Sequence, residues 1–205
     1  MSEIKLPRIV IWGCGAIGSN LAHLLIADRR DWSYLLVDYD VVEARNIPNQ
    51  WYYEHQIKQK KVEALQSNIY MAYGKIVDIY NQKISNFKFK LTTHLFEFIQ
   101  KANVWIDCFD NYESRKLLCN SAIPSLFDTL HIAFSASKTF EILWDEVYKP
   151  EKVEEQFDIC TWPGAKSFIN LVCSLASISV QKWVDKNEKW CFLGNEMGYE
   201  RNRIE

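Results

Sequence analysis

Residues 8 to 38 constrain the fold more than any other part of the sequence. Arg8–Trp12 is a short apolar run rich in β-branched residues, as expected of a buried parallel strand. A G-x-G-x-x-G pattern follows over residues 13–18, and Ser19–Ala27 then carries apolar residues at helical spacing. A second apolar run, Tyr34–Val37, ends at Asp38. This order predicts a strand, a glycine turn, a helix and a parallel strand, which together form one right-handed crossover unit.

The glycine turn suits a phosphate group. Gly13, Gly15 and Gly18 permit a tight turn and let backbone N–H groups approach a phosphate at the start of the helix. Asp38 lies where a carboxylate that binds a ribose is expected. The turn and Asp38 therefore predict nucleotide binding, although they do not separate ATP from NAD. A turn that only packs the helix on the strand is the structural alternative.

Strands and helices continue to alternate along the rest of the chain. We expect helices over 59–71 and 112–122, strands over 76–80 and 104–107, a candidate antiparallel pair at 131–134 and 140–144, and a helix after Pro163-Gly164. Residues 185–205 are charged, and the pattern leaves open whether they dock or fray. No repeat or domain boundary is visible. The prediction is one α/β domain over residues 1–205, with a Rossmann-like, mostly parallel sheet, helices on both faces and room for antiparallel strands in the C-terminal half.

Composition excludes several classes of function. With 24 Lys and Arg against 26 Asp and Glu, the net charge of −2 gives no general field for nucleic acid. Ser167–Gln181, the longest charge-free apolar stretch, is too short and too polar to span a membrane, and the charged N-terminus lacks the pattern of a signal peptide. We therefore expect a cytoplasmic protein. The six cysteines form no C-x-x-C pair, and the four histidines show no ligand spacing.

Three further segments narrow the interpretation. Asp38–Gln50 resembles the pattern D-x-D-x-V-x-x-x-N-L-x-R-Q, Ile57–Val62 resembles I-G-x-x-K, and Asp107–Arg115 is similar to D-x-x-D-N-x-x-x-R. Cys160–Ala165 is a looser match to a later segment of the same family. In this order the motifs resemble the E1-like adenylyltransferases, the family of the ubiquitin-activating enzymes and of the ThiF and MoeB type activators of sulfur carriers. The resemblance covers about residues 8 to 184.

The resemblance implies a function and a set of site residues. It implies ATP-dependent adenylation of a carboxylate, in which the carboxylate attacks the α-phosphate and pyrophosphate leaves; such catalysis depends on positioning and charge neutralisation. The implied substrate is a ubiquitin-like or sulfur-carrier protein, or a peptide, with a free C-terminus, and the implied assembly is a homodimer or heterodimer. Lys61, Asp110 and Arg115 would be the catalytic residues, with Lys61 on the phosphates and Asp110 on Mg²⁺. The nucleotide would contact Gly13, Gly15, Gly18, Asp38, Asp40, Asn46, Asn49 and Asn111.

Each implied role has a structural alternative. Lys61 lies in a cluster with Lys58 and Lys60, which is typical of a solvated helix start. Asp110-Asn111 is a good helix cap, and Arg115 could pair with a carboxylate of its own helix. Cys160 is a candidate for carrying an activated acyl group as a thioester, but no nearby cation is evident that would lower its pKa, so a packing cysteine is the simpler interpretation.

The sequence also departs from the family pattern. Asn49 stands where the motif has arginine, and asparagine supplies neither the charge nor the bidentate geometry of a guanidinium. Arg45 is one candidate replacement, Lys58 replaces the motif glycine, and only seven residues stand where the family carries an arginine-bearing arm. These departures favour either a divergent activator or a non-catalytic scaffold that pairs with an active partner. An NAD-dependent oxidoreductase is a third hypothesis, but it leaves Lys61 and Asp110 unexplained.

Overall fold

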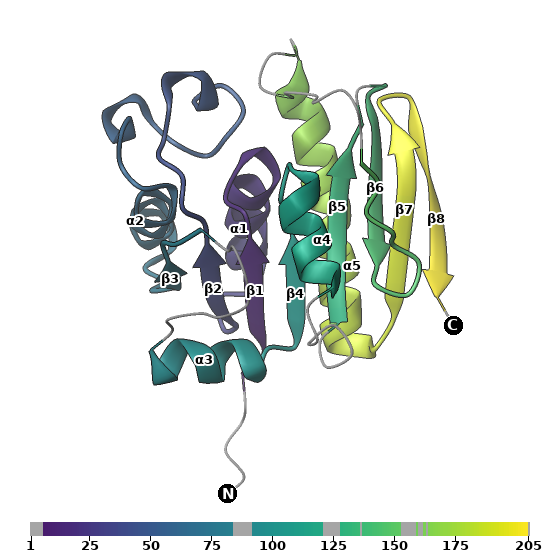
Figure 1. The fold of residues 1–205 in the computed structure, drawn as a ribbon, viewed down its shortest axis with the longest axis horizontal. Coiled ribbons are helices and arrows are strands. Elements are labelled where there is room, and N and C mark those ends of the chain that lie inside the picture. The colour runs from purple at the N-terminus through teal and green to yellow at the C-terminus, as the bar shows by residue number, and fades with distance from the viewer. Residues whose placement is uncertain are drawn as a thin grey trace, which may run out of the picture.

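The computed structural model describes residues 6–83, 92–120, 128–135, 137–152, 159, 162 and 164–204. Across these residues runs one eight-stranded sheet in the order β3-β2-β1-β4-β5-β6-β7-β8 (Figure 1). The strands are β1 (Arg8–Trp12), β2 (Ser33–Val37), β3 (Asp78–Tyr80), β4 (Val104–Asp107), β5 (Asp128–Phe134), β6 (Thr139–Trp144), β7 (Lys189–Asn195) and β8 (Gly198–Ile204). Strands β1 to β5 pair in parallel, and β6, β7 and β8 join antiparallel. The predicted Rossmann-like α/β fold, with antiparallel strands in its C-terminal half, is confirmed.

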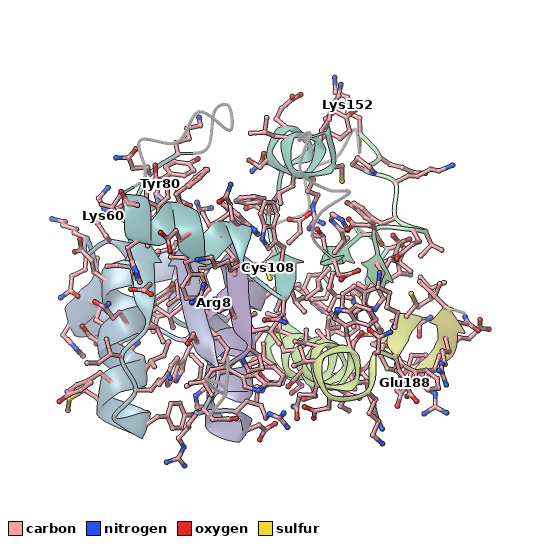
Figure 2. The ribbon with its side chains drawn as sticks, turned by 90° about the horizontal axis from the view of Figure 1, so that it is seen from below. Arg8, Lys60, Tyr80, Cys108, Lys152 and Glu188 are labelled. Carbon is pink, nitrogen blue, oxygen red and sulfur yellow. The ribbon has the colours of Figure 1, made fainter. Side chains whose placement is uncertain are left out.

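Helices cover both faces of the sheet. They are α1 (Ala16–Asp28), α2 (Lys61–Tyr73), α3 (Thr93–Gln100), α4 (Tyr112–Asn120) and α5 (Ala165–Lys186). Helices α1, α2 and α5 lie on one face and α3 and α4 on the other, as the view from below in Figure 2 shows. In β1, Ile9 and Ile11 point to the first face while Val10 and Trp12 point to the second. Because both faces are covered, the central strands are continuous apolar runs.

The end of the chain forms a hairpin, which settles the question that the sequence left open for residues 185–205. Strand β7 pairs with β6, and β8 pairs with β7 through a turn at Glu196-Met197. Cys191 and Phe192 of β7 are buried against the rest of the sheet. Helix α3, this hairpin and two short 3-10 helices, η1 (Ala44–Asn46) and η2 (Glu54–Gln56), are the described elements that the periodicity did not predict. The predicted role of Cys160 falls outside the described residues.

Helix α5 is the longest of the described helices. Neither it nor any other described helix combines the length and the apolar character needed to cross a membrane.

Candidate functional site

The sequence motifs meet at the carboxyl ends of three adjacent strands. Gly13 follows β1, Asp38 follows β2, and Cys108 follows β4. Strand β1 lies between the other two, and its end, Trp12, pairs with Val37 on one side and Asp107 on the other. From β1 the chain crosses to β2, which lies on one side of β1. It later enters β4, which lies on the other side of β1 (Figure 1). This is the topological switch point at which open α/β sheets bind their ligands.

The three glycines have different surroundings. A Cβ atom on Gly18 would lie 1.8 Å from the carbonyl oxygen of Gly13, so no side chain fits there. Gly13 has a φ of +90°, and a Cβ on it would lie 3.0 Å from the carbonyl oxygen of Cys108. A Cβ on Gly15 would meet nothing within 4 Å. Packing therefore explains Gly13 and Gly18, whereas Gly15 leaves open space in front of the first turn of α1.

Asp38 ties the glycine turn to the loop after β2. Its Oδ2 accepts a 2.7 Å hydrogen bond from the N–H of Cys14, and its Oδ1 accepts a 2.8 Å bond from the N–H of Asp40. The residue is buried, and burial raises the pKa of its carboxyl group, while the Lys61 ammonium acts in the opposite direction. The carboxylate is thus fixed in orientation beside the turn, where the sequence predicted a ribose-binding group.

Lys61 reaches this site because the chain folds back on itself. The N–H of Val42 donates to the carbonyl of Gln59, and the N–H of Lys61 donates to the carbonyl of Asp40 at 2.9 Å. The Lys61 ammonium then lies 3.1 Å from Asp40 Oδ2. Burial lowers the pKa of Lys61, but the carboxylates of Asp38 and Asp40 outweigh it and leave the pKa raised. At 7% exposure, Lys61 is a buried cation. The solvated-face alternative therefore holds for Lys58, which is exposed, and fails for Lys61.

Asp110 and Asn111 follow β4 on the other side of β1. Asn111 Oδ1 accepts a 2.9 Å hydrogen bond from the N–H of Ser114, so Asn111 caps α4 as the structural alternative predicted. Asp110 is exposed, and its Oδ1 accepts a 3.3 Å bond from the Asn111 amide. Its carboxylate is therefore available to solvent at the edge of the site.

Tyr39 links the two sides of the site. Burial raises the pKa of its hydroxyl, and carboxylates that include Asp110 raise it further. The Lys61 ammonium lowers the pKa of the same hydroxyl. Lys61 and Asp110, which stand 49 positions apart in the sequence, thus act on one side chain and belong to one neighbourhood.

Asn46 and Asn49 shape the loop between β2 and α2. Asn46 Oδ1 accepts a 2.9 Å bond from the N–H of Glu43, and its carbonyl accepts from the N–H groups of Asn49 and Gln50. The carbonyl of Asn49 in turn accepts a 2.9 Å bond from the Asn20 amide of α1. Both asparagines are buried. The loop is thereby held against the first turns of the helix that begins at the glycine turn.

Arg115 contacts a buried group of charges between α4 and the sheet. Its Nη2 donates to the carbonyl of Ile132 at 2.7 Å, and its Nη1 lies 3.6 Å from Asp107 Oδ2. Asp107 Oδ1 accepts from the N–H of Phe109 at 3.0 Å. The contacts of Arg115 therefore brace the loop that carries Asp110, and they place the guanidinium against β4 and β5.

His131 completes this group and was not singled out by the sequence. Its Nδ1 lies 2.9 Å from Asp107 Oδ2, and its Nε2 lies 2.8 Å from Asp145 Oδ1. Burial lowers the pKa of the imidazole, but the two carboxylates outweigh burial and raise the pKa to about 10. His131 is therefore an imidazolium at neutral pH. Asp107 and Asp145 lie 24 and 14 positions away along the chain, so no local pattern could have indicated the contact.

Within the described part of the chain, no group of three or more His, Cys, Asp or Glu side chains could hold a metal ion. A single exposed carboxylate such as Asp110 is the typical protein ligand of Mg²⁺ that is otherwise held by phosphate oxygens and water.

Solved structures with this fold include several complexes of one enzyme. E. coli MccB with AMPCPP and MccA matches with a TM-score of 0.73 and 16% identity, over 97% of this chain and 63% of that chain. The microcin C7 biosynthetic enzyme MccB in complex with N-formylated MccA matches at 0.72 and 14%, over 97% and 64%. PaaA matches at 0.70 and 16%, also over 97% and 64%. The chain thus spans less than two thirds of the length of these relatives.

Sequence comparison identifies the family. No curated protein matches the chain. The family model described as the ThiF family matches residues 1–140, which contain the glycine turn, the loop after β2, Lys61 and the segment after β4. This match covers 140 of the 205 residues, and the chain therefore belongs to the ThiF family.

Proposed function

We propose that this protein binds ATP with Mg²⁺ and adenylates a carboxylate, namely the C-terminal carboxylate of a ubiquitin-like or sulfur-carrier protein or of a peptide. The observation that carries the proposal is Lys61. Its ammonium is buried and kept charged by Asp38 and Asp40 beside the glycine turn. The buried cation and the open space at Gly15 together form a place for a phosphate chain.

In this reaction the protein has two main tasks, to position the carboxylate and the ATP and to neutralise negative charge on the phosphates. A carboxylate oxygen attacks the α-phosphorus of ATP, the bond from that phosphorus to the bridging oxygen breaks, and pyrophosphate leaves with the electron pair. Negative charge is spread over the phosphate oxygens during this step. Lys61, the N–H groups at the start of α1 and a Mg²⁺ ion on Asp110 would neutralise it.

Membership of the ThiF family and the solved relatives support this proposal. MccB has been crystallised with ATP and, separately, with AMPCPP and MccA. The motifs over residues 38–61 and 107–115 resemble those of adenylyltransferases. In the fold these two segments follow β2 and β4, the strands on either side of β1.

Exchange of labelled pyrophosphate into ATP tests the proposal. The assay uses the full chain with candidate carrier proteins and peptides that have free C-termini. We expect Lys61→Met and Asp110→Asn each to reduce exchange by about a hundredfold or more, since each removes a charge that acts on the transferring group. Lys101→Met is the matched control, because Lys101 is exposed directly after α3, and α3 lies at the opposite end of the parallel strands (Figure 1). Exchange that survives both substitutions would contradict the proposal, and so would a wild-type chain that binds no ATP.

A second candidate function is supported by Asn49. Because the motif arginine is absent there, the chain could serve as a nucleotide-binding scaffold in a heterodimer with an active partner. Wild-type chain that binds ATP but exchanges pyrophosphate only when a partner subunit is added would favour the scaffold. Normal exchange by the chain alone would exclude it.

A further inference from the structure

A lysine at the start of the last helix contacts the helix that begins at the glycine turn. Lys166 lies in the first turn of α5, and its ammonium donates a 2.5 Å hydrogen bond to Asn20 Oδ1 of α1. The two residues are 146 positions apart and meet because α1 and α5 pack on the same face of the sheet. Lys166 is half-buried, so its ammonium is partly withdrawn from water.

The charge of Lys166 is not balanced by a carboxylate of the described residues. Its ammonium has no described carboxylate oxygen within ion-pair distance, and burial lowers its pKa. Lys61 and Lys189 differ, because each lies beside two carboxylates that leave its pKa raised. Within the described residues, therefore, no carboxylate offsets the cost of partly removing this ammonium from water. An anionic ligand would remove this cost.

The contacts of Asn20 place this ammonium beside the proposed phosphate site. The Asn20 amide donates to the carbonyl of Ala16, the first residue of α1, and to the carbonyl of Asn49. Asn20 itself lies about one helical turn after Ala16, so Lys166 contacts α1 near its N-terminal end, which follows the glycine turn. It also lies next to the loop position where the motif arginine is missing.

Arg45, the other candidate for that missing charge, is already engaged. Its guanidinium is exposed and pairs with the Glu43 carboxylate at 2.5 Å. The geometry therefore favours a cation from α5 over a cation from the loop.

We propose that the Lys166 ammonium binds the phosphate chain of the nucleotide and supplies the positive charge that Asn49 lacks. This inference rests on the proposed function. The flexible four-carbon stem of lysine lets the ammonium move from Asn20 to a phosphate oxygen without movement of either helix.

Calorimetric titration of the full chain with ATP·Mg²⁺ and with AMP tests this inference. We expect Lys166→Met to weaken binding of ATP·Mg²⁺ by about tenfold to a hundredfold, as for the loss of one charge-assisted hydrogen bond, and to leave AMP binding unchanged. Lys166→Arg should restore most of the loss, because it keeps the charge. Lys186→Met, in the last and exposed turn of the same helix, is the matched control and should bind both ligands as the wild type does.

The outcomes separate this inference from the proposed function. If the wild type and Lys166→Met bind ATP·Mg²⁺ equally well, the inference about Lys166 is overturned and the proposed function is not affected. An equal loss for ATP and AMP also overturns it, since that result shows only structural support through Asn20. A wild-type chain that binds neither nucleotide contradicts the proposed function and this inference with it. Should Lys166→Met not fold, Lys166→Gln can still donate to Asn20 and replaces it in the titrations.

Discussion

Gly15 and Gly18 belong to one motif but differ in what an added methyl group would meet. At Gly18 the new Cβ would overlap the Gly13 carbonyl, so we expect Gly18→Ala to lower the free energy of unfolding by about 3 kcal/mol or more. At Gly15 the methyl group enters open space, and we expect Gly15→Ala to change stability by less than about 1 kcal/mol. The same methyl group would obstruct a phosphate, and ATP affinity should fall about tenfold or more. Urea unfolding and calorimetry measure the two effects. Undiminished ATP binding by Gly15→Ala would contradict the placement of the phosphate chain.

Lys58 adopts a backbone conformation that favours glycine. Its φ is +74°, and it stands at the position where the resembling motif has glycine. A left-handed conformation costs an L-residue roughly 1 to 2 kcal/mol. A new glycine costs roughly 0.5 to 1 kcal/mol in backbone entropy, which is the smaller of the two costs. We expect Lys58→Gly to raise the free energy of unfolding by about 0.5 to 1 kcal/mol. Lys75→Gly is the control, because Lys75 has no positive φ and should lose stability. Destabilisation by both substitutions would show that the Lys58 side chain stabilises the loop.

Single residues differ in how far the sequence predicts their role. Lys61 was singled out by the resemblance of Ile57–Val62 to a family motif, and its contact with Asp40 comes from a short local fold-back of the chain. His131 and Lys166 were not predictable, because their partners come from other elements that only the folded sheet brings near. The local sequence of these two residues carries no signal of these contacts. Such contacts between distant elements are set by the tertiary fold and leave no local pattern in the sequence.

The charges around His131 hold several elements together. Asp107 ends β4, His131 lies in β5, Arg115 lies in α4, and Asp145 follows β6. Such a buried network stabilises the fold only while its charges remain balanced. Because Asp107 also accepts from the N–H of Phe109, the network supports the loop that leads to Asp110.

This network predicts a pH dependence of stability. The folded pKa of His131 is raised to about 10 from 6.5. A raised pKa stabilises the folded state fully below the unfolded value, and the stabilisation is lost as the pH rises through the folded value. The free energy of unfolding should therefore fall by up to about 3 kcal/mol between pH 6.5 and 9 through this group. Urea unfolding across this range measures the decline.

Two comparisons assign that decline to His131. His131→Gln should be less stable at neutral pH and should lack most of the slope, whereas His55→Gln, at an exposed position, should keep it. If His131→Gln does not fold, NMR of the wild type replaces it. The ring resonances of His131 should then titrate far above pH 6.5. Titration near 6.5 would show that the two carboxylates do not hold the imidazolium.

The elements that the sequence missed have few buried positions. In β8 the first six residues are exposed, and in β7 only Cys191 and Phe192 are buried. Helix α3 buries Phe98 and Ile99 alone. A hydrophobic period needs several buried positions to be visible, and an edge hairpin or a short covering helix does not provide them. The strands β1, β2 and β4 were predicted because they are covered on both faces.

At the scale of the whole molecule, the parallel sheet is what turns three separate motifs into one site. Residues 13–18, 38–61 and 107–111 follow three neighbouring strands, and strands that run in parallel end at the same edge. The order of strands and motifs therefore predicted that these three segments lie at the same edge of the sheet. The contact of α5 with α1, on which the proposed role of Lys166 rests, was not predictable in this way, because α5 follows β6 in the antiparallel half of the sheet.

A ligand that touches all three segments should stabilise the entire fold. ATP·Mg²⁺ at a hundred times its dissociation constant adds about 2.7 kcal/mol to the free energy of unfolding. For a chain of this size, that gain raises the Tm by about 5 to 10 °C. NAD offers two riboses and two phosphates but no terminal phosphate for Lys61, so at the same concentration we expect a clearly smaller rise in Tm. Scanning calorimetry with each ligand measures the difference, and Asp38→Asn should abolish the response to ATP. A larger response to NAD would favour the oxidoreductase hypothesis, because the glycine turn and Asp38 would then bind a nucleotide without any need for Lys61 or Asp110.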